Sequence, residues 1–340
     1  MKKIVLILNG LLLFVGCITN ISTNENKSNI LIVTFGSCNK HNIENIFWDD
    51  IRSLNPDVFI WGGDIVYADT ANVKHIQFLY DSQNKVPEYA ALKGEVFITG
   101  TWDDHDYGLN DGGEEFDVKA QSQQAFLNFM AVPKSDKRRY RQGVYSSQLI
   151  SKPQGQVKIV NLDTRYFRTS LTKDTVNERR YKPNLFGEGT ILGDRQWQWL
   201  TEELNNSKAD FNIIVSSIQF LSNKHGFEKW ANYPSEVEKL KKLISNSKAK
   251  RIIILSGDRH ISEFSKSSIE GLSYPLIDFT SSGLTHSYTT FSKEENPFRV
   301  KEVVSKPSFG FLEFDFKTKN VVMRILGDDG VVLQELKQSY

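Results

Sequence analysis

The feature that most restricts the fold of this sequence is a series of short apolar runs bounded by glycine, proline, serine or aspartate. The runs are continuous rather than alternating, and they cover residues 30–35, 58–61, 96–99, 157–162, 211–216, 251–255 and 276–279. A continuous apolar run indicates a β-strand that is covered on both faces. Helical patterns lie between the runs, so the sequence predicts an α/β fold in which helices are layered on sheets.

The helical patterns repeat their apolar residues at intervals of about 3.6 and cover residues 43–54, 73–79, 122–130, 192–204 and 236–244. In the fourth of these, Trp197, Leu200 and Leu204 share one face, and Asp194 is expected to be the N-cap. The C-terminal part differs, because its apolar runs are separated by hairpin-type turns and predict an antiparallel meander. These runs are residues 309–314, 321–325 and 331–336. No Pro- or Gly-rich linker divides residues 30–340, which are expected to form a single domain.

Ligand-type side chains follow five of the predicted strands, at the point where each strand ends. The turns that carry them are residues 36–38, 61–69, 101–106, 216–219 and 256–260. The carboxyl ends of the strands in an α/β sheet converge on one edge, so these turns are expected to be neighbours. Each of these sequences taken alone could be an ordinary turn or helix cap. Four aspartates gathered at one edge, however, would repel one another unless cations neutralise them. These aspartates are Asp64, Asp104, Asp106 and Asp258.

The N-terminus has the pattern of an export signal. A basic start at Met1-Lys2-Lys3 precedes an apolar stretch that is short for a membrane span, and Phe14-Val15-Gly16-Cys17 resembles a bacterial lipoprotein cleavage box. Residues 1–16 are therefore predicted to be a lipoprotein signal peptide, Cys17 the lipidated residue and residues 17–29 a flexible tether. A simple cleaved signal or an uncleaved anchor are the alternatives. The protein is expected to be exported and anchored to a membrane of the cell envelope, on its periplasmic or outer face.

Charge and cysteine content restrict the partners and the site. The net charge of +1, from 42 basic and 41 acidic residues, predicts no nucleic acid as a structural partner. If Cys17 carries lipid, Cys38 is the remaining cysteine of the two, and it is either a buried apolar residue or a metal ligand. A thiolate and a phenolate, from Cys38 and Tyr67, suit Fe³⁺, whereas carboxylate and amide oxygens suit Ca²⁺, Mg²⁺ or Mn²⁺. Two cations that share Asp64 would hold a hydroxide able to attack phosphorus in line.

The turns taken together resemble the PhoD-like alkaline phosphatases of the calcineurin-like metallophosphoesterase superfamily. The resemblance extends from about residue 30 to residue 290, in the order of the family's motifs. It rests on Gly36-Ser37-Cys38, Gly63-Asp64-Ile65-Val66-Tyr67, Trp102-Asp103-Asp104-His105-Asp106, Ser217-Ile218-Gln219 and Ser256-Gly257-Asp258-Arg259-His260. Three further stretches, residues 162–168, 192–200 and 281–286, support it. The resemblance implies a four-layer αββα sandwich and a dinuclear or larger cluster of the Fe³⁺/Ca²⁺ type, with Mn²⁺, Mg²⁺ or Zn²⁺ as alternatives.

The resemblance also implies roles for individual residues. Cys38 and Tyr67 match the iron ligands, and Asp64 matches the bridge between the metals. Asp104, Gln219 and Asp258 are expected to complete the two coordination spheres. His260 matches a ligand position of the superfamily, and the alternative is a place behind Asp258 in contact with phosphate.

Four other residues are predicted to act on the substrate. His105 flanks a ligand and is expected to protonate the leaving oxygen while Asp106 holds it. Arg165 and Arg168 are either a phosphate clamp or ordinary ion pairs. His286 is expected at the rim of the site.

The sequence therefore predicts an enzyme that hydrolyses phosphate esters. A phosphomonoesterase is the first interpretation, and a phosphodiesterase acting on nucleotides, phospholipid headgroups or wall polymers is the second. A solute-binding lipoprotein is a third class, which would have no need of Asp64, Asp104 and Asp258 together. The chain ends at Tyr340 directly after a predicted strand, so a more open site is expected than in larger members of the family. The oligomeric state is not indicated.

Overall fold

The computed structural model describes residues 29–177, 179–292 and 294–340. The predicted signal peptide 1–16, the lipidation site Cys17 and the tether up to residue 28 lie outside the described residues, so these assignments stay predictions. Within the described part of the chain, every helix is too short or too polar to cross a lipid bilayer.

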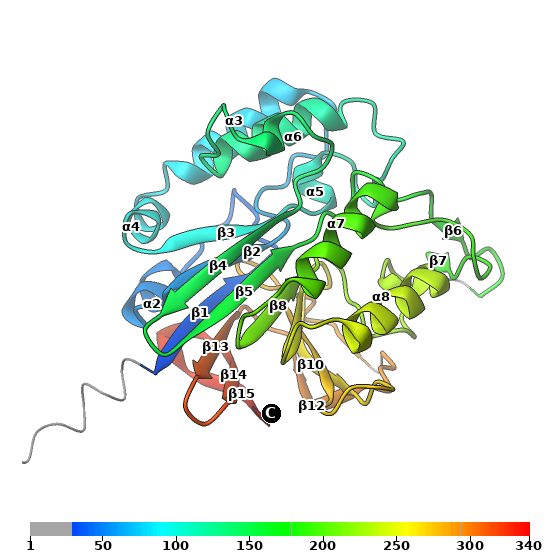
Figure 1. The fold of residues 1–340 in the computed structure, drawn as a ribbon. Helices are drawn as coiled ribbons and strands as arrows, with labels where there is room; N and C mark the ends of the chain where they lie inside the picture. Colours follow the sequence, from blue (N-terminus) through cyan, green and yellow to red (C-terminus); the bar gives the residue numbers. More distant parts are fainter. Residues whose placement is uncertain (1–28, 178, 293) are drawn as a thin grey trace, which may run out of the picture.

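Two large sheets form the centre of the molecule (Figure 1). The first consists of β1 (Ile30–Gly36), β2 (Val58–Gly62), β3 (Phe97–Thr101), β13 (Phe309–Asp315), β14 (Asn320–Leu326) and β15 (Val332–Ser339). Their spatial order is β15-β14-β13-β1-β2-β3. β1, β2 and β3 run parallel, whereas β13, β14 and β15 form the antiparallel meander that the sequence predicted.

The second sheet has seven strands in the spatial order β12-β10-β11-β9-β8-β5-β4. They are β4 (Ser146–Lys152), β5 (Gly155–Asn161), β8 (Phe211–Val215), β9 (Ile252–Ser256), β10 (Ser262–Ser267), β11 (Leu276–Ser281) and β12 (Arg299–Val304). The central strands β5, β8, β9 and β11 are parallel. A separate hairpin pairs β6 (Thr172–Lys173) with β7 (Tyr181–Lys182).

Helices cover the outer faces of both sheets (Figure 1). The α-helices are α2 (Trp48–Ser53), α3 (Val73–Asn84), α4 (Pro87–Glu95), α5 (Asp104–Tyr107), α6 (Lys119–Phe129), α7 (Gly193–Asn205) and α8 (Pro234–Asn246). Three short 3-10 helices are η1 (Lys137–Arg139), η2 (Trp230–Asn232) and η3 (Asp328–Gly330).

Three apolar clusters define the layers. The middle cluster packs one sheet against the other, with the rings of Phe35 in β1 and Phe279 in β11 4.8 Å apart. A second cluster, which includes Trp48 and Tyr89, joins the first sheet to α2, α3, α4 and α6. A third, which includes Trp197 and Leu240, joins the second sheet to α7 and α8. The four-layer αββα sandwich expected from the sequence is confirmed.

The structure differs from the sequence predictions in several elements. The helix expected at 43–54 begins only at Trp48, because a turn occupies the preceding residues and the Asn45 side chain accepts from the backbone N–H of Phe47. Asp194 is not the cap of α7, since the helix begins at Gly193 without a side-chain cap. Glu236 of α8 accepts the free N–H of Ile191 there instead. The sequence analysis also missed α4, β4, β10 and β12.

Candidate metal centre

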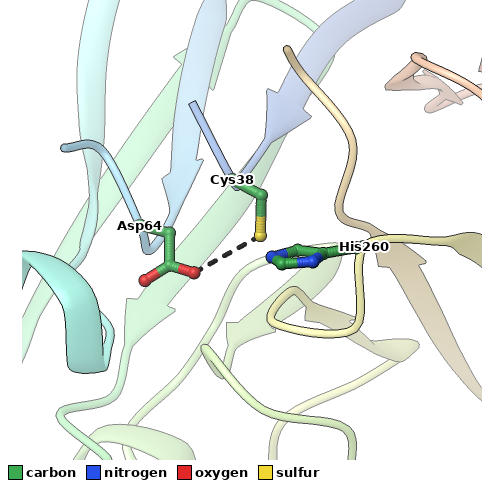
Figure 2. A group of neighbouring side chains, drawn as sticks. All are labelled: Cys38, Asp64 and His260. Atoms are coloured by element: carbon green, nitrogen blue, oxygen red, sulfur yellow. Dashed lines mark hydrogen bonds between the residues drawn. The ribbon is translucent and has the colours of Figure 1, made fainter. Parts of the chain in front are cut away.

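The turns that follow the parallel strands of both sheets meet at one edge of the sandwich. Cys38 follows β1 and Asp64 follows β2, while His260 follows β9 of the other sheet. In Figure 2 the three side chains point toward one another from their separate turns. Their donor atoms all lie within 4.8 Å of one another, which is close enough to surround one ion. The convergence predicted from the sequence is thus present in the structure.

Tyr67 completes this first group. Its hydroxyl oxygen is 3.4 Å from Asp64 Oδ2, 3.1 Å from His260 Nε2 and 3.3 Å from His286 Nε2. Cys38 Sγ is 3.4 Å from the same carboxylate oxygen of Asp64. A thiol, a phenol, a carboxylate and two imidazoles therefore share one small volume, and this donor set suits a strongly Lewis-acidic transition ion.

A second group shares Asp64 with the first. Donor atoms of Asp64, Asp104 and His105 also lie within 4.8 Å of one another. The backbone N–H of His105 donates to Asp64 Oδ1 at 3.3 Å, and Asp111 N–H donates to Asp104 Oδ2 at 2.7 Å. Asp64 therefore belongs to both groups, and its predicted role as a bridge between two metals stays a prediction.

Asp104 belongs to a third group with Asp103 and Asp258. Asp103 Oδ1 accepts from Arg165 Nε at 2.5 Å and from Ser217 Oγ at 2.7 Å, whereas Asp103 Oδ2 is buried without a partner among the described residues. A buried carboxylate oxygen without a donor is destabilising unless a cation or water meets it. The oxygen ligands on this side suit a hard divalent cation.

Several of these residues have an unusual backbone conformation. The φ angles of Cys38, Asp64, Asp258 and His260 are 60°, 50°, 67° and 53°, in the left-handed region that non-glycine residues seldom adopt. Gly63, which precedes Asp64, has φ 103°, and a Cβ atom there would lie 2.5 Å from Asp103 Cβ. Strained backbone of this kind concentrates at functional sites.

Burial governs the pKa values of the donors. It raises the pKa of the Cys38 thiol to about 12, and the nearby Asp258 adds to the rise while the hydroxyl of Ser282 opposes it. It also raises the pKa of Asp64 well above its usual range, with Cys38 and Asp104 as further causes. Both groups would be protonated or destabilised without a positive partner. The clustered donors therefore fit bound cations, which would stabilise the thiolate and the carboxylates.

His105 and His286 are in contrasting environments. Burial lowers the pKa of His105, but the hydrogen bond to Asp69 and the nearby carboxylates outweigh it and raise the pKa to about 10. Burial and His260 lower the pKa of His286 to about 4. His105 Nδ1 lies 2.7 Å from Asp69 Oδ1, and Asp69 therefore fixes the orientation of the ring.

The prediction that Asp106 holds His105 was wrong. Asp106 accepts from the backbone N–H groups of Asp103 and Ile65, at 2.6 and 3.2 Å, and from the Tyr80 hydroxyl. These bonds occupy both of its oxygens, and the one from Asp103 is part of a capping box at the start of α5. Asp106 therefore shapes the turn, and Asp69 holds the histidine.

The two arginines predicted to bind phosphate are buried instead. The side chain of Arg165 is 0% exposed and pairs with Asp103 and with Glu228, whose Oε2 is 2.5 Å from Arg165 Nη1. The side chain of Arg168 is 1% exposed, and its Nε lies 2.9 Å from Glu228 Oε1. Both arginines form ion pairs, but these are buried rather than on the surface as the alternative expected, because Glu228 pairs with both guanidinium groups in the interior. In this structure neither is free to clamp a phosphate.

Gln219 is buried and bonded away from the ligand groups. Its Nε2 donates to Glu263 at 2.7 Å and to Thr280 at 2.9 Å, and its Oε1 has no partner among the described residues. Its role as a ligand stays a prediction.

Sequence reasoning missed three residues of the site. Asp103 and Asp69 stood within the motifs but had no assigned role, although each follows or adjoins a predicted strand end. Ser282 lies 3.1 Å from Cys38 Sγ and accepts from His260 N–H at 2.7 Å, and it therefore ties the two sheets together at the site. Nothing in the sequence near Ser282 signalled that contact.

Comparisons with known proteins identify the family of this chain. The profile of the PhoD-like phosphatase family matches residues 33–319. Alkaline phosphatase D of Bacillus subtilis (strain 168) is 26% identical over 245 residues, which are 62% of this chain and 40% of that protein. The chain thus aligns with less than half the length of that relative.

Solved structures share the fold at lower identity. A structure of PhoD has a TM-score of 0.70 at 18% identity, covering 92% of this chain and 68% of its own. GAP50, the anchor in the inner membrane complex of Plasmodium, has a TM-score of 0.60 at 13% identity, covering 91% and 89%. A dimetal phosphatase from Danio rerio has a TM-score of 0.53 at 11% identity, covering 91% and 99%. From the family profile over most of its length, the chain belongs to the PhoD-like phosphatase family.

Proposed function

We propose that this protein is a metal-dependent hydrolase of phosphate esters. The observation that carries the proposal is the pair of donor groups that share Asp64, because two adjacent cations are the arrangement used for in-line displacement at phosphorus. The similarity to alkaline phosphatase D supports the same chemistry. A phosphomonoesterase is the first candidate.

We propose that the first ion is Fe³⁺, held by Cys38, Asp64, Tyr67 and His260, and that the second is Ca²⁺ or a similar hard cation. The second would be held by Asp64, Asp104 and Asp258, with Asp103 nearby. When bound, such cations polarise phosphoryl oxygens and lower the pKa of water. The soft donors on one side and the carboxylates on the other support two different ions.

The protein's own part in the reaction is to place a proton donor beside this centre. His105 stacks on Tyr67, with ring centroids 4.2 Å apart, and Asp69 holds its Nδ1. This leaves Nε2 for the substrate, and a protonated His105 is able to donate a proton to the leaving oxygen. Asp69 is the positioning residue for that transfer.

The test is metal analysis combined with ester assays on the wild type and on Cys38→Ser. We expect the wild type to contain iron and to hydrolyse 4-nitrophenyl phosphate faster than bis(4-nitrophenyl) phosphate. The variant should lose iron, and its activity should fall at least about tenfold. Even residues that only hydrogen-bond to a metal ligand contribute this much.

Hydrolysis that survives complete removal of metal would overturn the proposal. A faster reaction with the diester would instead favour the phosphodiesterase. Cys17→Ser is the matched control, since it makes the same substitution at a cysteine outside the described residues. It should leave the iron content unchanged.

Replacing Asp69 by asparagine should lower kcat about 10- to 100-fold with little change in KM, because the ring of His105 loses its anchor. The hydrogen bond to Asp69 raises the pKa of His105. Its loss should therefore move the alkaline limb of the kcat profile to lower pH, since His105 must be protonated to donate. The side chain of Asp69 is 45% exposed, so folding should not change. A profile identical to the wild type would exclude this role.

A further inference from the structure

The β6–β7 hairpin packs beside the metal centre on the segment 225–229. The backbone N–H of Tyr181 in β7 donates to the carbonyl of Gly226 at 2.9 Å. The Tyr181 hydroxyl donates to Asp111 Oδ2 at 2.7 Å, and the backbone N–H of Asp111 donates to Asp104 of the centre. The hairpin is thus joined to a predicted ligand through Asp111.

A buried ammonium group without a carboxylate partner lies under this hairpin, beside a buried arginine and a buried histidine. Lys229 is 2% exposed, its Nζ donates to the carbonyl of Phe227 at 3.0 Å, and no carboxylate of the described residues lies within 4.0 Å of it. Arg259 stacks on the ring of Phe227, 4.1 Å from its centroid, and its Nε is buried without a partner among the same residues. His225 accepts from Phe227 N–H through Nδ1, which leaves a buried Nε2 without a partner there.

The nearby carboxylates do not balance these charges. Glu228 is occupied by Arg165 and Arg168, and Glu294 by Arg259 at 2.7 Å. Burial is the main cause that lowers the pKa of Lys229 to about 8, and Arg259 and Arg179 are further causes, so these cations lie within electrostatic reach of one another. An uncompensated buried charge creates a positive potential that extends to the neighbouring surface.

Arg180 brings this positive charge to the surface. Its side chain is 49% exposed, and its Nη2 pairs with Asp111. A guanidinium has five N–H donors, so donors remain for a ligand. Asp104 is among the groups that raise the pKa of Arg180, which puts the guanidinium within electrostatic reach of the centre. Arg180 is therefore an exposed cation on the hairpin side of the site, with buried cations behind it.

We propose that this side of the centre is a second anion subsite, with Arg180 as the contacting group and the buried Lys229 as the source of the surrounding positive field. The proposal rests on the proposed function and names a substrate class. Esters whose leaving group carries its own negative charge should be preferred over esters with a neutral leaving group. Selectivity of this kind arises from charge complementarity at the subsite.

The test compares two substrates that differ in this charge alone, 4-(carboxymethyl)phenyl phosphate and 4-ethylphenyl phosphate. A methylene group insulates the carboxylate from the ring, so the two phenols are leaving groups of similar acidity. For the wild type we expect kcat/KM to be about tenfold higher for the charged ester, the effect of one charge-assisted hydrogen bond. The ratio should fall toward one in Arg180→Met and to an intermediate value in Lys229→Met. It should also fall as salt is added.

Arg52→Met is the matched control, because Arg52 also forms an exposed ion pair, with Glu95 at 2.7 Å, but lies in α2 and not in the hairpin. Its ratio should equal that of the wild type. A wild-type ratio near one, or a ratio that Arg180→Met leaves unchanged, would overturn the subsite while leaving the hydrolase intact.

Binding provides a readout that needs no turnover. Calorimetry with 4-ethylbenzylphosphonate and 4-(carboxymethyl)benzylphosphonate, which are not hydrolysed, should show tighter binding of the charged compound to the wild type. Arg180→Met should weaken that compound selectively, and equal weakening of both would count against the subsite. If the wild type hydrolyses neither ester, the proposed function fails, and this binding difference still decides the subsite.

Discussion

Replacing Asp64 by asparagine is expected to abolish esterase activity and to remove both metal ions at once. Asp64 is the residue that the two proposed ligand sets share, so its loss should weaken both ion positions. Cations in such sites supply several kcal/mol of transition-state stabilisation, so at least about a thousandfold loss in kcat is expected. Elemental analysis and the nitrophenyl phosphate assay measure the two effects.

The control for this experiment is Asp329→Asn. Asp329 has a φ angle of 55°, close to the 50° of Asp64, but it lies in η3, on an exposed turn outside the site. Asparagine tolerates the left-handed conformation, so both variants should fold. If Asp64→Asn kept its metal and its activity, the shared bridge would be ruled out.

The metal-free protein gives a second readout. Burial raises the pKa of Asp64, and Cys38 and Asp104 raise it further. A carboxyl group with a raised pKa in the folded state makes the chelated protein less stable as the pH rises through that pKa. Asp64→Asn removes this charge, so after chelation the variant should be at least as stable at neutral pH as the chelated wild type. Urea unfolding at pH 5 and pH 8 measures the difference.

Replacing Glu228 by glutamine is expected to have the largest effect on stability. Glu228 is 1% exposed and pairs with both Arg165 and Arg168, which are themselves buried. The substitution would leave two buried guanidinium groups short of negative charge, and breaking a buried ion pair in this way costs about 3–5 kcal/mol. The midpoint of thermal unfolding should fall by roughly 5–10 °C.

Glu335→Gln is the matched substitution at the surface. Glu335 pairs with Arg324 at 2.8 Å and is 33% exposed, so its loss should change stability by less than about 1 kcal/mol. Equal stability of Glu228→Gln and wild type would show that the buried network contributes nothing net. Because Arg165 also holds Asp103, a decrease in metal affinity should accompany the loss of stability.

Much of the fold was predictable because the central strands are buried on both faces. β2, β8 and β9 are completely buried, which is why their sequences are continuous apolar runs. β4 was missed because it lies at the edge of its sheet, where more and less exposed side chains alternate instead of forming a continuous apolar run. β12 was missed for a similar reason, since Arg299, Lys301 and Glu302 interrupt its apolar residues.

The candidate site was predictable where ligands follow strands directly, as at Cys38, Asp64 and Asp258. It was not predictable where distant partners decide the role of a side chain. Arg165 is buried in an ion pair with Glu228, which is 63 residues away in sequence. His105 is held by Asp69, which is 36 residues away. Such pairings depend on tertiary contacts that local sequence does not contain.

The two sheets contribute separately to the centre: β1 and β2 lead to Cys38 and Asp64, and β9 leads to Asp258 and His260. Neither half of the molecule holds a complete ligand set. We therefore expect cations to bind late in folding, once both halves have docked through the apolar interface between them. Bound metal would then link the two halves across that interface. Its uptake should be the last step of folding, and its removal should first weaken the contact between the halves.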